Sequence, residues 1–161
     1  MLFPKTRKTG VCVLGAICCG ALITNVTLKP LIARMRPYAA SEVFRSYWEL
    51  VGASVESDLS FPSGHATTIA AAMMGLTFAR GKKYLWLSVP YIALMCASRN
   101  YLMVHYPSDV IAGVIAGTLG AVAAFFITKL IYSVIEKHPE NGFCSFVLTF
   151  DVCKLFASKE K

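Results

Sequence analysis

The chain has 161 residues, of which 56% are hydrophobic and only 16% are charged, and its mean hydropathy is +0.57. This composition excludes an ordinary soluble domain, in which roughly half of the residues are apolar and about a quarter are charged. The formal charge of +7 does not indicate nucleic-acid binding, because the basic residues stand in small groups at the ends of apolar segments and form no continuous stripe.

Four apolar stretches organise the sequence, at Val11–Leu28, Ala66–Phe78, Tyr84–Ala97 and Val110–Val134. Their β-branched, Gly and Ala content is typical of packed transmembrane helices. The second and third are shorter than the ~20 residues that usually cross a bilayer, unless their helices continue into the polar motifs at Pro62 and Arg99. We therefore expect residues 1–137 to form one membrane-embedded, all-α domain, a bundle of about four spanning helices.

The first polar cluster is KPLIARMRP, at residues 29–37. Its cations Lys29, Arg34 and Arg36 have a simple explanation, because basic side chains favour helix C-termini and reach toward the membrane surface. Alternatively, Lys29 and Arg36, with six residues between them and Pro37 after them, are spaced to clamp a multiply charged oxyanion. The cluster by itself leaves both interpretations open.

The segment Ser41–Gly52, SEVFRSYWELVG, mixes aromatic and charged residues as an interfacial helix does. It is either a plain amphipathic connector or a lid that guides lipid toward a site.

The second polar cluster is FPSGHATT, which contains Ser63, Gly64 and His65. Proline and a small hydroxyl residue open a helix, and glycine lets an anion approach the backbone. The free amides of a helix N-terminus bind phosphate, and His65 would then stand beside that phosphate. A capped helix start with an incidental histidine remains the alternative.

The third polar cluster, SRNYLMVHYPSD, runs from Ser98 and Arg99 to His105 and Asp109. His105 and Asp109 are four residues apart, so one helical turn would bring them to the same face, where the carboxylate can hold one imidazole nitrogen. Alternatively, Asp109 complements a helix dipole and Arg99 anchors its helix at the membrane surface.

The last segment, residues 138–161, has an apolar centre, FCSFVLTF, that is too short to span a bilayer. We expect a cytoplasmic, surface-associated tail, with His138 outside any site.

The distribution of Lys and Arg predicts the orientation in the membrane. Basic residues precede the first stretch, join the second to the third and follow the fourth: Lys5, Arg7, Lys8, Arg80, Lys82, Lys83 and Lys137. If these ends face the cytoplasm, the clusters around Arg36, His65 and His105 all emerge on the outer face.

Two histidines, an aspartate and several cations at one end of a bundle form a pattern typical of phosphoryl transfer. Cations and amides can hold the equatorial oxygens, one histidine can attack, and the other can protonate the leaving oxygen. The nine acidic residues include no carboxylate cluster suited to a pair of metal ions, and no Cys/His ligand spacing occurs. We expect a site that uses no metal and no cofactor.

The three strings together resemble the tripartite signature of the type 2 phosphatidic acid phosphatase superfamily. That signature has Lys, six residues and Arg-Pro, then Pro-Ser-Gly-His, then Ser-Arg, five residues, His, three residues and Asp. Lys29–Pro37, Pro62–His65 and Ser98–Asp109 match it without a change in spacing. The resemblance spans about residues 5 to 123.

The resemblance implies a role for each matching residue. Lys29, Arg36 and Arg99 would bind phosphate with help from Ser63 and the Gly64 amide. His65 would protonate the leaving group. His105, held by Asp109, would attack phosphorus to give a phosphohistidine that water hydrolyses.

Membrane members of the family usually have six transmembrane helices and an active site that faces the periplasm or cell exterior. Two of those helices normally precede the Lys-to-Arg-Pro string, whereas only MLFPKTRKT precedes the first apolar stretch here. The chain therefore looks shortened at its N-terminus.

The predicted function is hydrolysis of a lipid phosphate or diphosphate, such as undecaprenyl diphosphate, phosphatidic acid or phosphatidylglycerophosphate. We expect an integral protein of a bacterial plasma membrane, with the site on the outer side, the lipid phosphate and the bilayer as partners, and no nucleic acid. The sequence does not predict the oligomeric state. A lipid phosphotransferase, a vanadate-dependent haloperoxidase and an inactive truncated relic remain alternatives.

Overall fold

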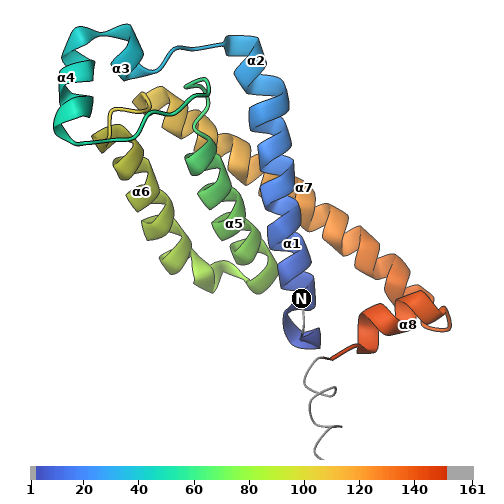
Figure 1. Ribbon diagram of the computed structural model, residues 1–161. Coiled ribbons are helices and arrows are strands. Elements are labelled where there is room, and N and C mark those ends of the chain that lie inside the picture. The colour runs from blue at the N-terminus through green and yellow to red at the C-terminus, as the bar shows by residue number, and fades with distance from the viewer. Residues whose placement is uncertain (1–2, 152–161) are drawn as a thin grey trace, which may run out of the picture.

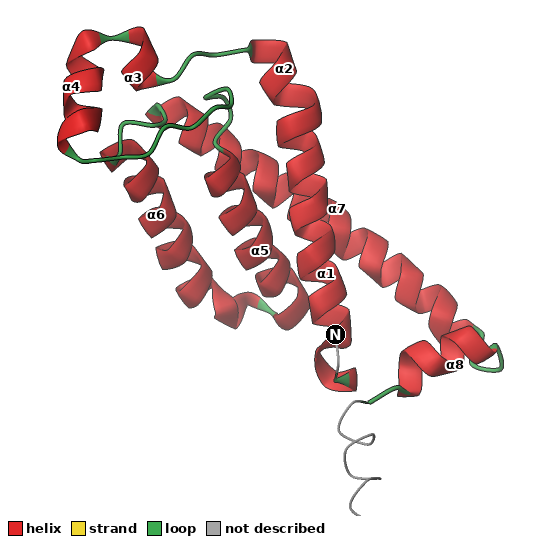
Figure 2. Cartoon of the chain, in the orientation of Figure 1, coloured by secondary structure: helices red, strands yellow, loops and turns green. Residues whose placement is uncertain are grey.

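The computed structural model describes residues 3–151, and every regular element in this range is a helix (Figures 1 and 2). The elements are α1 (Pro4–Ala21), the π-helix η1 (Leu22–Leu28), α2 (Lys29–Ile32), α3 (Pro37–Ala40), α4 (Glu42–Leu50), α5 (Gly64–Arg80), the 3-10 helix η2 (Lys82–Tyr84), α6 (Leu85–Tyr101), α7 (Pro107–Lys137) and α8 (Gly142–Thr149). The prediction of an all-α fold is confirmed.

The four predicted apolar stretches are the cores of the four long rods of the bundle. α1, η1 and α2 follow one another as a single rod, and α5, α6 and α7 are the other three (Figure 1). Among residues 3–151, two helical segments are long and apolar enough to cross a membrane, one within Lys5–Ala40 and the other Pro107–Lys137. α5 and α6 have 17 residues each, at the lower limit of about 17–25 for a span, so the number of four spans stays a prediction.

Both short stretches extend into the polar motifs, as the sequence led us to expect. α5 begins at Gly64, with Ser63 as its N-cap and the Ser63 hydroxyl accepting the Ala66 amide at 3.4 Å. α6 continues through Arg99 in its last turn. The motif residues therefore stand at the ends of the helices, where backbone groups and side chains can face a ligand.

Small residues let α7 cross α5 and α1 at very close range. A Cβ at Gly113 would lie 2.6 Å from the Ser63 carbonyl oxygen, and one at Gly120 would lie 2.6 Å from the Gly20 nitrogen. A Cβ at Gly117 would collide with the Thr67 carbonyl oxygen. Such contacts between small residues are a common way of packing membrane helices. They hold the start of α5 directly against the start of α7.

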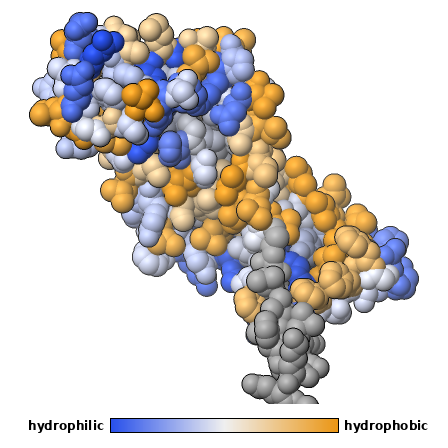
Figure 3. All heavy atoms as spheres, viewed as in Figure 1, coloured by the Kyte–Doolittle hydropathy of each residue, from blue (hydrophilic) through white to orange (hydrophobic). Residues whose placement is uncertain are grey.

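Large apolar side chains are exposed along α6 and α7, among them Trp86, Leu94, Ile111, Phe126 and Leu130. Figure 3 shows hydrophobic residues over the middle of the bundle and hydrophilic residues gathered around α3 and α4. An apolar surface of this extent is expected where lipid replaces water as the solvent.

The amphipathic segment after the first cluster forms α4, in agreement with the helix predicted for Ser41–Gly52. It folds back on α3, and the Tyr38 and Trp48 rings stack with their centroids 4.7 Å apart. α3 and α4 lie at the same end of the bundle as the starts of α5 and α7 (Figure 1). The role of α4 at the membrane surface stays a prediction.

The opposite end of the bundle carries the start of α1 and the short helix α8 (Figure 1). Arg7 donates hydrogen bonds to the carbonyl oxygens of Val147 and Phe150, and Lys8 pairs with Glu136 at 2.5 Å. The predicted tail falls partly on α8, while residues 152–161 lie outside the described range. Its cytoplasmic, surface-associated character stays a prediction.

Candidate active site

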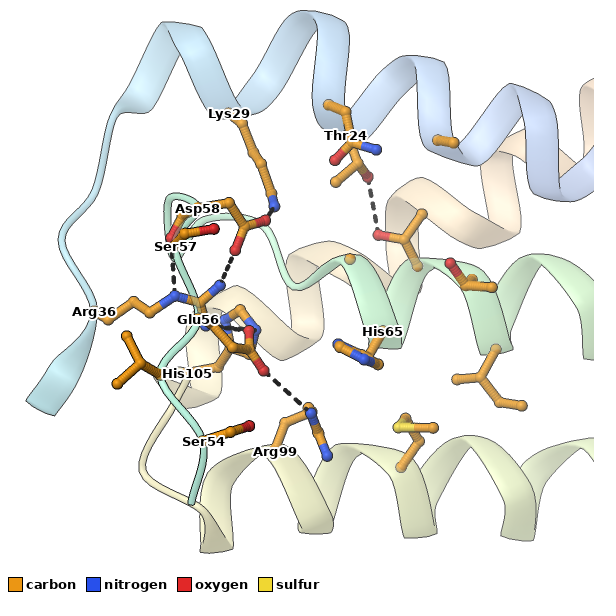
Figure 4. A pocket seen from close by; sticks show the side chains of 18 of the residues that line it. Thr24, Lys29, Arg36, Ser54, Glu56, Ser57, Asp58, His65, Arg99 and His105 are labelled. Carbon is orange, nitrogen blue, oxygen red and sulfur yellow. Dashed lines mark hydrogen bonds and ion pairs between the residues drawn. The ribbon is translucent and has the colours of Figure 1, made fainter. Parts of the chain in front are cut away.

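The three polar clusters meet around one cavity of about 770 Å³ (Figure 4). Its lining includes Lys29 and Arg36 from the first cluster, Gly64 and His65 from the second, and Arg99 and His105 from the third. The prediction that the three clusters come together at one end of the bundle is confirmed. His138 lies outside this lining and pairs with Glu140 at 3.3 Å.

The three predicted phosphate-binding cations reach the cavity from different elements. Lys29 is the first residue of α2, Arg36 is the N-cap of α3, and Arg99 lies in the last turn of α6. The Arg36 side chain is only 4% exposed. Its Nη1 donates to the Val104 carbonyl oxygen at 3.0 Å, which fixes the guanidinium beside His105. Arg36 is thus the centre of the cation cluster.

Arg99 presents an unused donor. Among residues 3–151, its Nε is buried and has no hydrogen-bond partner, and its Nη2 bonds only weakly to the Ser98 hydroxyl, at 3.3 Å. A buried N–H without an acceptor is unfavourable by about 1–3 kcal/mol. An anion bound in the cavity would supply the missing acceptor.

Two carboxylates from the loop before α5 face the cations. Glu56 pairs with Arg36 at 2.6 Å and with Arg99 at 3.4 Å, and Asp58 pairs with both Lys29 and Arg36. Figure 4 shows Lys29 and Arg99 approaching this loop from opposite sides. Carboxylate oxygens and phosphate oxygens are equivalent acceptors for these cations, so the two acids occupy the place of an oxyanion.

His105 lies in the loop between α6 and α7 and is 3% exposed. Its Nε2 faces the cavity, 3.3 Å from Arg36 Nη1 and 3.9 Å from the Glu56 carboxylate. Burial, reinforced by the Arg36 charge, lowers the pKa of His105 from 6.5 to about 4, although Glu56 and Asp109 act in the opposite direction. The imidazole is therefore neutral at pH 7, so one ring nitrogen carries a lone pair, and at Nε2 this lone pair can accept a hydrogen bond from Arg36 Nη1.

His105 and Asp109 lie close together, but not on one helical turn as their spacing predicted, because His105 precedes α7. Pro107 occupies the first turn of α7, where its missing N–H is not needed, and His105 precedes the helix. Asp109 Oδ2 instead caps the start of α7 by accepting the Tyr106 amide at 3.0 Å. It lies 3.7 Å from His105 Nδ1, close enough for electrostatic attraction and too far for a direct hydrogen bond.

The second cluster forms another part of the cavity wall. Ser63 is fully buried, and its backbone N–H donates to the Asp109 carbonyl oxygen at 3.0 Å. Gly64 and His65 line the cavity, and His65 is exposed there. Ser63 itself lies behind the wall as the helix cap. The N-terminus of α5, where the first amides of a helix lack intrahelical partners, therefore lies at the cavity wall.

The described residues of the site form no cluster of metal ligands. Within residues 3–151, no group of three or more His, Cys, Asp or Glu side chains is arranged to hold a metal ion. The donors that line the cavity are cations, imidazoles and helix amides, which suit an anionic ligand.

The sequence model of the PAP2 superfamily matches residues 9–133, which include all three clusters. This chain belongs to the PAP2 superfamily. The resemblance seen in the three motifs is confirmed, and each of the three motifs of this PAP2 chain contributes residues to the cavity lining.

Several curated proteins resemble this PAP2 chain over most of its length. A lipid A 4'-phosphatase from Porphyromonas gingivalis is 29% identical over 135 residues, which are 81% of the chain and 56% of the relative. A decaprenylphosphoryl-5-phosphoribose phosphatase from Mycobacterium tuberculosis is 38% identical over 123 residues, 74% of the chain and 62% of the relative. An undecaprenyl-diphosphatase from Sulfolobus acidocaldarius is 30% identical over 119 residues, 73% of the chain and 54% of the relative.

The PAP2 chain thus spans little more than half the length of the curated relatives it matches. No solved structure matches it significantly.

Four side chains of this PAP2 site were not assigned a role from the sequence: Arg34, Glu56, Asp58 and Ser60. Arg34 was noted only as one of three cations, yet it pairs with Asp109 at 2.8 Å and does not line the cavity. Glu56, Asp58 and Ser60 lie in an irregular loop without periodicity. The only sequence signal was their position just before the Pro-Ser-Gly-His string.

Proposed function

We propose that this chain is the catalytic part of a membrane-bound lipid phosphatase that releases phosphate from a lipid phosphate or diphosphate without a metal ion. The observation that carries the proposal is the position of His105: a buried, neutral imidazole whose Nε2 faces a cavity lined by Lys29, Arg36 and Arg99. A neutral nucleophile beside several cations suits attack on a phosphate whose charge the cations hold.

In the proposed reaction, the lone pair of His105 Nε2 forms a bond to phosphorus while the bond from phosphorus to the leaving lipid oxygen breaks. His65, exposed in the cavity, donates a proton to that oxygen. A water molecule then attacks the phosphohistidine, gives its proton to His65 and returns His105 to its neutral form. Inorganic phosphate leaves.

The anion would be held from two directions. Lys29, Arg36 and Arg99 would replace their carboxylate partners by phosphate oxygens, and Arg99 Nε would gain an acceptor. The first amides of α5, with Gly64 allowing close approach, would contact the remaining oxygen.

A membrane lipid as substrate is supported by the apolar helices and by the names of the relatives, which act on lipid A, undecaprenyl diphosphate or a decaprenylphosphoryl sugar phosphate. These substrates share a phosphate at the headgroup of a membrane lipid. We propose the same kind of substrate for this chain, a membrane lipid that carries a phosphate at its headgroup. We also propose that hydrolysis takes place on the outer face of the membrane.

The test is phosphate release from a panel of undecaprenyl diphosphate, phosphatidic acid, phosphatidylglycerophosphate and lipid A, with the protein in detergent and EDTA present. We expect release that EDTA does not abolish, and a loss of at least about 1,000-fold in His105→Ala, because the nucleophile is removed. Rapid quenching with radiolabelled substrate should trap an acid-labile phosphoenzyme in the wild type and none in the variant.

Loss of activity on chelation would contradict the metal-free mechanism, and an unchanged rate in His105→Ala would contradict the nucleophile. Transfer of the phosphate to an added lipid in place of water would identify a phosphotransferase. Halide oxidation with bound vanadate would identify a haloperoxidase.

A further inference from the structure

Behind the cavity wall, the Asp109 carboxylate is completely buried and both of its oxygens are engaged. Arg34 Nη1 donates to Oδ1 at 2.8 Å. Ser60 Oγ donates to Oδ2 at 2.5 Å, and the Tyr106 amide donates to the same oxygen at 3.0 Å. The carboxylate is therefore fixed in one orientation by neighbours whose roles the motifs do not explain.

The inner nitrogen of His105 faces the side chains of both Ser60 and Asp109. His105 Nδ1 is 3.5 Å from Ser60 Oγ and 3.7 Å from Asp109 Oδ2. A hydroxyl can accept one hydrogen bond and donate another, so Ser60 can lie between the imidazole and the carboxylate as a link. Its side chain is fully buried, which excludes water as a competing partner on that side.

We propose that Ser60 and Arg34 are positioning residues of the site: Ser60 connects His105 to the Asp109 carboxylate, and Arg34 holds that carboxylate in place. This inference rests on the proposed function, because it concerns the histidine that would attack phosphate.

The link has a chemical purpose in that reaction. Attack by Nε2 needs its lone pair, so the ring proton must sit on Nδ1, and a proton there needs an acceptor. In the proposed link, Nδ1–H donates to Ser60 Oγ, 3.5 Å away, and the Ser60 hydroxyl donates in turn to Asp109 Oδ2. When Nε2 bonds to phosphorus the ring becomes cationic, the proton stays on Nδ1, and the buried carboxylate stabilises the new charge.

Arg34 contacts the residues around Asp109 through both its backbone and its side chain. Ala33, with φ of 49°, ends α2 and turns the chain before Arg34. The Arg34 carbonyl oxygen accepts the Ser60 amide at 2.9 Å, while the guanidinium lies 3.9 Å from the centre of the Tyr106 ring. Arg34 therefore fixes both Asp109 and the segment that carries Ser60.

The first test is the kinetics of Ser60→Ala. Removing a residue that orients a functional side chain typically lowers activity about 10- to 100-fold, so we expect kcat to fall by that factor with KM nearly unchanged. Ser60→Thr, which keeps the hydroxyl, should restore most of the rate. The matched control is Ser88→Ala: Ser88 is also fully buried and bonded to Thr77 and Met73, at a distance from the cavity, and its removal should leave kcat unchanged.

The second test asks whether the two residues act through Asp109. In an Asp109→Asn background, Ser60→Ala and Arg34→Gln should each lower kcat by less than about threefold, because the link is already broken. Full losses in that background, equal to those in the wild-type background, would overturn the proposal. Arg45→Gln, a change at an exposed arginine on α4, serves as the control for loss of a guanidinium.

The third test does not depend on activity. Nitrogen NMR of histidine-labelled protein in detergent at pH 7 should show His105 with its proton on Nδ1, identified by the loss of its signals in His105→Gln. In Ser60→Ala the proton should move, at least in part, to Nε2. An unchanged tautomer in a folded variant would overturn the proposal. If the wild type released no phosphate from any lipid, the proposed function would fail, while this measurement would still decide the role of Ser60.

Discussion

His105 is buried, and its imidazole is neutral at pH 7 and carries a ring-nitrogen lone pair. Burial disfavours the charged imidazolium, and the neighbouring Arg36 guanidinium disfavours a second positive charge, so the pKa of the imidazole falls to about 4. Protonation of His105 would place an imidazolium against a guanidinium. Under the proposed function, this neutral form is the one that attacks phosphorus.

We predict that His105 stays neutral between pH 7 and about pH 5 and becomes protonated only near pH 4. A depressed pKa means that the neutral form persists at pH values where a free histidine, with its pKa of 6.5, is already charged. In Arg36→Gln the titration midpoint should rise, because the repelling charge is gone. NMR titration of the histidine rings measures both values, and a wild-type midpoint near 6.5 would contradict the prediction.

At the scale of elements, the loop between α4 and α5 places two acids against the cations. Glu56 and Asp58 pair with Lys29, Arg36 and Arg99 without any helix to hold the loop in position. A phosphate needs the same donors, so the acids and the ligand compete. The Asp58 side chain is 54% exposed and can move into solvent more readily than the half-buried Glu56.

The double variant Glu56→Gln, Asp58→Asn should bind oxyanions more tightly than the wild type. Partly exposed ion pairs contribute up to about 1 kcal/mol each, so we expect the inhibition constant of orthovanadate to fall by about fivefold or more. Glu49→Gln, on the exposed face of α4, should leave the constant unchanged. Weaker vanadate binding in the double variant would contradict this competition. It would show that the two acids hold the cations in the position that binds an oxyanion.

The crossing of α5 and α7 is the second feature decided at the level of elements. Gly113 lies against the Ser63 carbonyl oxygen. The Ser63 amide in turn donates a hydrogen bond to the Asp109 carbonyl oxygen. The start of α5 can therefore face His105 only if α7 offers no side chain at this point.

We predict that Gly113→Ala lowers the melting temperature and the activity together. The new Cβ would lie 2.6 Å from the Ser63 oxygen, and overpacking of this kind typically destabilises by about 1–3 kcal/mol. Gly142→Ala is the control, because nothing lies within 4 Å of a Cβ at Gly142. Equal melting temperatures for the two variants would contradict the importance of the close crossing.

At the scale of the whole molecule, the two ends of the bundle differ in character. The cavity and α4 lie at one end, and the start of α1, the α5–α6 turn and the end of α7 lie at the other (Figure 1). The second end carries Lys5, Lys8, Lys82, Lys83 and Lys137. Positive residues favour the cytoplasmic side, so the cavity should open outward.

Labelling of intact cells tests this orientation. In a variant whose native cysteines are replaced, Ser57→Cys at the rim of the cavity should react with a membrane-impermeant maleimide, and Lys83→Cys in the α5–α6 turn should react only after the cells are broken. The opposite pattern would show that the site faces the cytoplasm.

The sequence by itself determined the helical class, the apolar stretches and the residues of the three motifs. These features depend on local chemistry: runs of apolar residues form helices in lipid, and Pro, Ser and Gly open or end them. The grouping of Lys29, His65 and His105 at one end also followed, because alternate helices run in opposite directions.

Only the tertiary structure decided how the site is completed. Arg34 and Asp109 are 75 residues apart in the chain and Ser60 and Asp109 are 49 apart, so neither contact leaves a periodic trace in the sequence. The ion pairs of Glu56 and Asp58 depend on the path of an irregular loop, for which no propensity or repeat exists. Motif spacing thus identified the side chains proposed to carry out the chemistry. Packing across the bundle decided which other side chains contact them: Arg34 and Ser60 beside Asp109, and Glu56 and Asp58 paired with the cations.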